Sequence, residues 1–314
     1  MRAKASGKLM VNGMCILCGS SDLKKSGYGG YEYAGQRFTI VRCTKCGFMF
    51  LQPVPSKEVV DSIYFNDEYF DTYSLTEKGL ASYLDVIHDD HAYSEEVLRL
   101  LKNYALGGKL LDVGCAGGRF LLRAQSAGFD AWGIEPNQKM ATFARQELHL
   151  NAVCGHLASH PFSRETFDVV HLGDVLEHLP DLEESMITIR GLLKEGGILV
   201  LGQPVTYNRS FFNLFLRINM ALMKNEYSTN PPAHIWEFTP SVLRRFIQQS
   251  GFKILCGRVY ETRPINLGAY QRVTLKNRIG FLIRILSSWV SNAGLFSSLE
   301  LGNRMLVICQ KAPF

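Results

Sequence analysis

Several features are absent from this chain of 314 residues. It has no uncharged apolar run of about 18 residues, which excludes an ordinary membrane-spanning helix. No apolar segment follows the basic start at Met1–Lys4, so we expect no secretory signal and a cytoplasmic location. The net charge is only +5 and forms no basic stripe, so no dedicated nucleic-acid partner is expected. Repeats and low-complexity tracts are also missing, which excludes solenoids and disordered chains.

The cysteines argue against a disulfide framework. Of the eight, four form two Cys-x-x-Cys pairs near the start, and the rest are isolated, mostly in apolar runs. This distribution is typical of a reducing compartment and a metal site. Hydrophobic residues make up 46% and charged residues 20%, so the chain can bury a large core, in about two domains.

From residue 109 onward, short apolar runs alternate with helical patterns, which predicts an α/β fold with a doubly wound, parallel sheet. The expected strands are 109–113, 130–134, 152–154, 167–172, 197–203, 252–260 and 304–310. The expected helices are 118–127, 137–149, 181–193 and 240–250.

A glycine-rich turn follows the first of these strands, in Asp112-Val-Gly-Cys-Ala-Gly-Gly118. Small residues there let the backbone approach a ligand, and the helix that follows presents free amides to an anionic group. Glu135 ends the next strand, where a carboxylate can accept hydrogen bonds from ribose hydroxyls. The dinucleotide pattern G-x-G-x-x-G is absent, and Asp112 would repel a pyrophosphate but suits an ammonium group.

This segment resembles motif I of class I S-adenosylmethionine-dependent methyltransferases. Residues 167–181 and 192–199 resemble the fourth-strand motif and the turn into the fifth strand of the same family. The resemblance implies a Rossmann-like, seven-stranded, mostly parallel sheet whose last strand is antiparallel. It also implies S-adenosylmethionine as a cofactor, bound by Asp112, Gly114, Cys115, Ala116, Gly118, Glu135, Pro136, His156, Leu157 and Gly173. Two positions depart from the family: Ala116 replaces a usual glycine, and His156 stands where many relatives place an adenine-binding aspartate.

The paired cysteines predict a zinc ribbon. Cys15, Cys18, Cys43 and Cys46 form two Cys-x-x-Cys-Gly knuckles, and four thiolates suit tetrahedral Zn²⁺. A closed four-cysteine site has no open position, so we expect a structural role for the zinc. The competing interpretation is a pair of redox dithiols. The ribbon resembles those of small-molecule methyltransferases more than those of ribosomal-RNA guanine methyltransferases.

Catalytic candidates follow the fourth strand and precede the sixth. They are His178, His234 and Asp174, with His234 in a stretch that resembles the His-x-x-x-Phe-Thr-Pro segment of the superfamily. Either histidine could accept a proton from the acceptor. The pattern Asp174-x-x-Glu177-His178 with a later His234 is similar to the metal site of small-RNA 2′-O-methyltransferases and ubiquinone-pathway O-methyltransferases. A second divalent metal is therefore a further candidate, and helix capping by Glu177 and His178 is the structural alternative.

These interpretations give three parts: a zinc ribbon at 1–52, a helical, substrate-side segment at 53–105, and a methyltransferase domain at 106–314 with insertions at 209–240 and 265–300. The predicted function is methyl transfer to a small-molecule acceptor, with a hydroxyl oxygen preferred. The alternatives are C- or N-methylation of a nucleotide sugar, and an RNA- or protein-binding ribbon on a scaffold domain. Residues 276–296 are amphipathic with flanking basic residues, which leaves weak membrane-surface contact open. The sequence does not indicate an oligomeric state.

Overall fold

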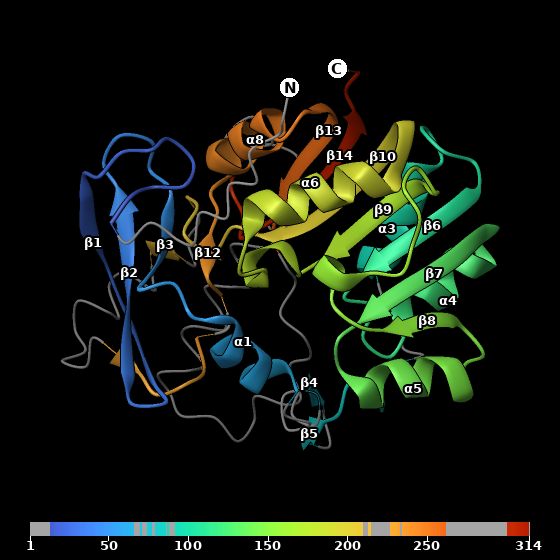
Figure 1. The fold of residues 1–314 in the computed structure, drawn as a ribbon, viewed down its shortest axis with the longest axis horizontal. Coiled ribbons are helices and arrows are strands. Elements are labelled where there is room, and N and C mark those ends of the chain that lie inside the picture. Colours follow the sequence, from blue (N-terminus) through green and yellow to red (C-terminus); the bar gives the residue numbers. More distant parts are fainter. Residues whose placement is uncertain are drawn as a thin grey trace, which may run out of the picture.

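The structure is a computed structural model that describes residues 13–65, 70, 74–76, 79–85, 87, 92–209, 213–214, 227–232, 234–261 and 300–313. It contains a seven-stranded sheet, a five-stranded sheet beside it, and a two-stranded hairpin (Figure 1). The segment 276–296 and most of the insertions predicted at 209–240 and 265–300 lie outside the described residues. Among the described residues, no helix is long and apolar enough to cross a membrane.

The seven-stranded sheet has the order β13-β14-β10-β9-β6-β7-β8. β14 is antiparallel to both of its neighbours, and β6 to β10 are parallel, which confirms the predicted Rossmann-like topology. Its strands are β6 (Gly108–Val113), β7 (Phe129–Glu135), β8 (Asn151–Cys154), β9 (Phe167–Gly173), β10 (Leu193–Pro204), β13 (Phe252–Tyr260) and β14 (Arg304–Lys311).

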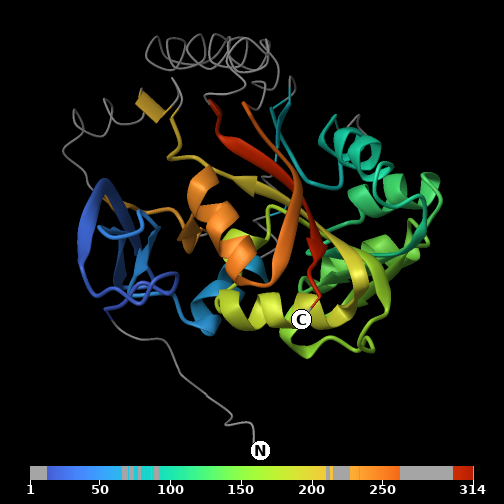
Figure 2. The same ribbon diagram turned by 90° about the horizontal axis from the view of Figure 1, so that it is seen from above.

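Helices cover both faces of this sheet (Figure 2). One face packs against α3 (Ala92–Leu101), α4 (Arg119–Ser126) and α5 (Gln138–Gln146), and the other against α6 (Leu182–Leu192) and α8 (Pro240–Gln249). Neighbouring residues of one strand face opposite sides of the sheet. On β6, Leu110 packs on the side of α3, α4 and α5, and Leu111 packs on the side of α6 and α8. Side-chain caps start three of the helices, with Asn137, Asp181 and Thr239 each accepting from an amide three residues ahead.

The five-stranded sheet combines the N-terminal residues with a distant segment. β1 (Leu23–Tyr33), β2 (Gln36–Cys43) and β3 (Met49–Gln52) form an antiparallel meander. β11 (Tyr227–Ser228) extends it along β1, and β12 (Trp236–Glu237) pairs with β3. We call this sheet the ribbon sheet. Its inner side shares one continuous core with the α6/α8 face of the seven-stranded sheet.

Between the two sheets, the chain is less helical than the sequence suggested. α1 (Lys57–Tyr64) and α3 are separated by the hairpin of β4 (Ser74–Thr76) and β5 (Gly79–Ala81). Two short 3-10 helices, η1 (Leu157–Ser159) and η2 (Leu176–His178), follow β8 and β9. Both lie at the carboxyl ends of parallel strands, where α/β proteins place their ligands.

Candidate active site

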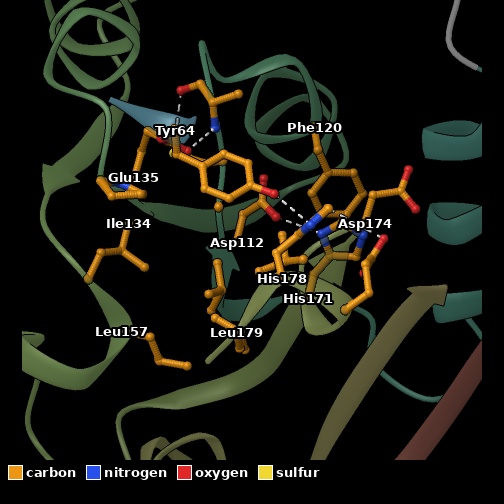
Figure 3. Close-up of a pocket in the computed structure, with 18 of the residues that line it drawn as sticks. Tyr64, Asp112, Phe120, Ile134, Glu135, Leu157, His171, Asp174, His178 and Leu179 are labelled. Carbon is orange, nitrogen blue, oxygen red and sulfur yellow. Dashed lines mark hydrogen bonds and ion pairs between the residues drawn. The ribbon is translucent and has the colours of Figure 1, made fainter. Parts of the chain in front are cut away.

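A cavity of about 1280 Å³ opens at the carboxyl ends of the parallel strands. Figure 3 shows side chains from β6, β7, β9 and α1 directed into it. Nine of the ten predicted cofactor residues line the cavity, and Gly118 alone is absent from the lining residues. Gly118 instead caps α4 with a φ of +95°, and a Cβ there would lie 2.5 Å from Leu150.

The glycine-rich turn adopts the conformation that its composition predicts. Gly114 has a φ of +70°, and a Cβ on it would lie 2.6 Å from Val175. Ala116 takes a left-handed φ of +46°, so the residue that replaces a usual glycine bears the backbone strain itself. Cys115 lines the cavity, and its buried thiol packs against Gly133. Burial also raises the pKa of this thiol well above its usual range.

Glu135 is held by the backbone of two loops. Its two oxygens accept hydrogen bonds from the amides of Ala116 (2.9 Å) and Asn137 (2.8 Å). Each carboxylate oxygen has a further lone pair, so both can still accept from vicinal ribose hydroxyls. The side chain is buried, and burial raises the pKa of Glu135 to about 7.

The predicted adenine end is built differently from the family pattern. Pro136 and Leu157 line the cavity, and His156 lies beside them with Nε2 3.9 Å from Asp61 Oδ1. The Phe65 ring meets the His156 ring edge-on, with centroids 5.6 Å apart. Residues at the end of α1 therefore surround the histidine that replaces the usual aspartate.

Asp112, which is predicted to face the ammonium group of the methyl donor, lines the cavity and has a protein partner. Its Oδ1 is 2.7 Å from Nδ1 of the buried His171. Gly173, at the end of the same strand β9, also lines the cavity.

Beyond the cofactor half, Glu177, His178 and His234 come together. Their nearest ligand-type atoms all lie within 4.8 Å of one another. Glu177 Oε1 is buried and has no hydrogen-bond partner, and it faces Nε2 of His178 at 3.6 Å and Nε2 of His234 at 4.0 Å. Its other oxygen accepts from the Gln203 amide at 2.9 Å. Burial, reinforced by Asp174, raises the pKa of Glu177 to about 7. We call these three residues the seam cluster.

The outer nitrogen of each histidine is also occupied. Tyr64, the last residue of α1, places its hydroxyl 2.6 Å from Nδ1 of His178. Nδ1 of His234 lies 3.6 Å from the buried carboxylate of Glu237 in β12. Burial opposes protonation of His234, but Glu237, Glu177 and Asp174 outweigh it and raise its pKa to about 9.

Asp174 does not join the seam cluster. It has a φ of +57° and forms an ion pair with Arg304 of β14, and its side chain is 47% exposed. The grouped ligand atoms come from Glu177, His178 and His234 alone. The structure thus brings together two of the three predicted catalytic residues, and Asp174 borders the same cavity from outside the group.

The four paired cysteines form a second cluster, in the ribbon. Sγ atoms of Cys15 and Cys46 are 3.5 Å apart, and those of Cys18 and Cys43 are 3.6 Å apart. Tetrahedral coordination by thiolates at about 2.3 Å places sulfurs about 3.8 Å apart, so the cluster fits a zinc ion. Burial opposes ionisation of Cys43, yet the amides of Cys46 and Lys45 outweigh it and lower its pKa to about 7.

Sequence reasoning missed five residues that complete the site: Tyr64, Tyr93, His171, Gln203 and Glu237. Glu237 and His171 carried a local signal, because Glu237 follows His234 by three residues and His171 precedes Gly173 by two. Tyr64, Tyr93 and Gln203 reach the site through contacts between distant segments, which no spacing in the sequence reveals.

Comparison with known proteins agrees with this geometry. A family model described as a methyltransferase domain matches residues 86–256, more than half of the chain. The ubiquinone biosynthesis O-methyltransferase of Azoarcus sp. is 29% identical over 166 residues, covering 49% of this chain and 69% of that protein. The protein of the same name from Coxiella burnetii is 24% identical over 155 residues and covers 48% and 65%. The match to the Coxiella protein thus spans less than two thirds of its length.

Among solved structures, the chain is similar to one that contains the Trm112 methyltransferase activator of Haloferax volcanii in complex with a methyltransferase. The TM-score is 0.52 at 13% identity, covering 73% of this chain and 93% of that one. This likeness supports the fold alone. Together, the family match, the curated relatives and the sheet order lead to one conclusion: the chain belongs to the methyltransferase-domain family and is a class I S-adenosylmethionine-dependent methyltransferase.

Proposed function

We propose that this enzyme transfers the methyl group to a hydroxyl oxygen of a small molecule. One observation carries the proposal: the buried, unpartnered Oε1 of Glu177, which faces a nitrogen of both His178 and His234. A hydroxyl acceptor must lose a proton during transfer, whereas the sulfonium itself supplies the activated methyl group. The names of the relatives, ubiquinone biosynthesis O-methyltransferases, support the same acceptor atom.

The seam cluster fits a divalent cation. Two imidazole nitrogens and one carboxylate oxygen converge, and the outer nitrogens of the histidines are held by Tyr64 and Glu237, as the outer nitrogens of metal-bound histidines usually are. A bound cation would lower the pKa of an acceptor hydroxyl. Glu177 and the two histidines would hold it.

A second candidate for the same step needs no cation. Tyr64 fixes the His178 ring through Nδ1, which leaves Nε2 to accept a proton from the acceptor. We further propose that the four ribbon cysteines hold a structural zinc, and that residues 1–52, 53–105 and 106–314 act as ribbon, substrate-side segment and catalytic domain.

The acceptor atom can be identified with S-adenosylmethionine labelled with ¹³C in the methyl group and a panel of catechols, phenols, polyols and nucleotide sugars. We expect label on oxygen, which the methyl carbon shift distinguishes from label on nitrogen or carbon. Label on carbon or nitrogen, or on RNA alone, would reject the hydroxyl acceptor and favour one of the alternative functions.

The cation is tested by brief EDTA treatment, with the ribbon zinc measured by mass spectrometry before and after. Lost turnover that returns with Mg²⁺ or Mn²⁺, at constant zinc, supports the cation. Unchanged turnover assigns the step to His178 as a base.

A further inference from the structure

His171 stands beside the motif I acid at the centre of the sheet. It lies on β9 in direct register with Asp112 on β6, so both side chains leave the same face. The two side chains are only 3% and 5% exposed. A buried polar pair of this kind must be satisfied within the protein.

The hydrogen bonds continue beyond His171. Nδ1 lies 2.7 Å from Asp112 Oδ1 (Figure 3). Nε2 lies 2.9 Å from the hydroxyl of Tyr93 in α3. An ionised carboxylate only accepts, so Nδ1 carries the proton and donates it to Asp112. Burial raises the pKa of Tyr93 well above its usual range, so its hydroxyl stays protonated and can donate to Nε2.

Two glycines leave room for the side chains of Tyr93 and His171. A Cβ on Gly202 would lie 2.0 Å from the Tyr93 hydroxyl, and one on Gly173 would lie 3.0 Å from His171. These two glycines face each other in register on β10 and β9. The Phe120 ring stacks on His171 at 3.8 Å, so the imidazole cannot rotate freely. Packing and hydrogen bonds together fix the orientation of Asp112.

We propose that His171 is a positioning residue for the methyl donor, which holds Asp112 in the orientation that meets the ammonium group of the methionine moiety. Tyr93 connects this support to α3. One oxygen of Asp112 is hydrogen-bonded to His171. Among the described residues, the other oxygen accepts no hydrogen bond, and Asp112 lines the cavity. The proposal rests on cofactor binding and is independent of the acceptor atom.

The test compares two ligands by calorimetry. S-adenosylhomocysteine carries the amino-acid moiety, and 5′-methylthioadenosine lacks it. We expect His171→Leu to weaken S-adenosylhomocysteine about tenfold and to leave 5′-methylthioadenosine nearly unchanged. His171→Asn, whose amide can replace Nδ1 as a donor, should restore most of the affinity. Adding Asp112→Asn to His171→Leu should cause no further loss.

A merely structural histidine would behave differently. Equal weakening of both ligands, or no weakening of S-adenosylhomocysteine, would overturn the proposal. If His171→Leu fails to fold, Tyr93→Phe provides the same comparison with a smaller change, because it removes only the hydroxyl that supports Nε2. Tyr93→Phe must then weaken S-adenosylhomocysteine more than 5′-methylthioadenosine.

Discussion

The two large sheets are assembled in different ways. Five strands of the seven-stranded sheet follow one another from residue 108 to residue 204, joined through single helices or short 3-10 turns. The ribbon sheet joins residues 23–52 to strands at 227–228 and 236–237. The predicted cofactor residues lie on strands of the first sheet or on the turns that follow them, whereas His234 and Glu237 belong to the segment that pairs with the second sheet. Glu177 therefore follows a strand of a sheet most of whose strands follow one another in the sequence, and His234 comes from a segment that pairs with strands far away in the sequence.

Backbone hydrogen bonds make this connection. The Leu51 amide of β3 donates to the Ile235 carbonyl at 3.0 Å, and the Ile235 amide donates to the Glu177 carbonyl at 2.9 Å. Trp236 stacks on Phe48 of the ribbon and donates its indole N–H to the Leu179 carbonyl at 2.7 Å. The ribbon is thus connected to the seam cluster through Ile235 and Trp236.

Among changes outside the seam cluster, the largest expected effect comes from breaking the ribbon. Cys43→Ser with Cys46→Ser should remove the zinc and lower methyl transfer on the order of 100-fold, because β12 loses its partner strand. Affinity for S-adenosylhomocysteine should stay within about threefold, because its residues lie on the other sheet. Cys256→Ser, on β13, is the matched control and should change neither quantity. A parallel loss of cofactor affinity would contradict the separation of the two sheets.

The pH dependence of cofactor binding tests the other half. Burial raises the pKa of Glu135 to about 7, so the carboxyl gains a proton as pH falls through that value and then accepts ribose hydroxyls less well. Affinity for S-adenosylhomocysteine should fall by up to about tenfold per pH unit below 7. Glu135→Gln should bind more weakly with a flat profile. A variant that keeps the wild-type slope would assign the titration to another group.

A smaller effect is expected at the contact between the sheets. Trp236→Phe keeps the stacking on Phe48 but removes the indole N–H, and turnover should fall about fivefold. Trp132→Phe removes the comparable indole bond to Asp130 on β7 and should leave turnover unchanged. Equal effects of the two substitutions on turnover would show that the position of the tryptophan is unimportant.

The smallest effect is expected at Asp174. Asn tolerates its left-handed conformation, and the ion pair with Arg304 is partly exposed, so Asp174→Asn should lower turnover less than about fivefold. Steady-state kinetics should compare the turnover of Asp174→Asn with that of Glu177→Gln. A loss as large as that of Glu177→Gln would restore Asp174 to the catalytic group.

The strands of the seven-stranded sheet could be predicted from the sequence because each is a short apolar run bounded by turn residues. Asp112, Gly114 and Glu135 could be placed at the cavity because their spacing to the strand ends is local. The pairing of β12 with β3 could not be predicted, because two residues of extended chain carry no signal of their partner. The hairpin at 74–81 was read as helical for a similar reason, since strands of three residues show no alternation.

In the candidate site, too, local features could be predicted and contacts between distant segments could not. Glu177 and His178 follow β9 directly, so their nearness to the cofactor half could be predicted. The departure of Asp174 depends on Arg304, more than one hundred residues away, and the support of His178 depends on Tyr64. Both are contacts between distant segments, which a motif of the form Asp-x-x-Glu-His does not encode.

We propose that the seam cluster activates the acceptor while the seven-stranded sheet and its turns bind the cofactor. Measuring turnover and S-adenosylhomocysteine affinity of Glu177→Gln in one preparation tests it most directly. We predict that turnover falls on the order of 100-fold or more while affinity stays within about threefold. Turnover close to that of the unmodified enzyme, or a matching loss of affinity, would contradict the claim.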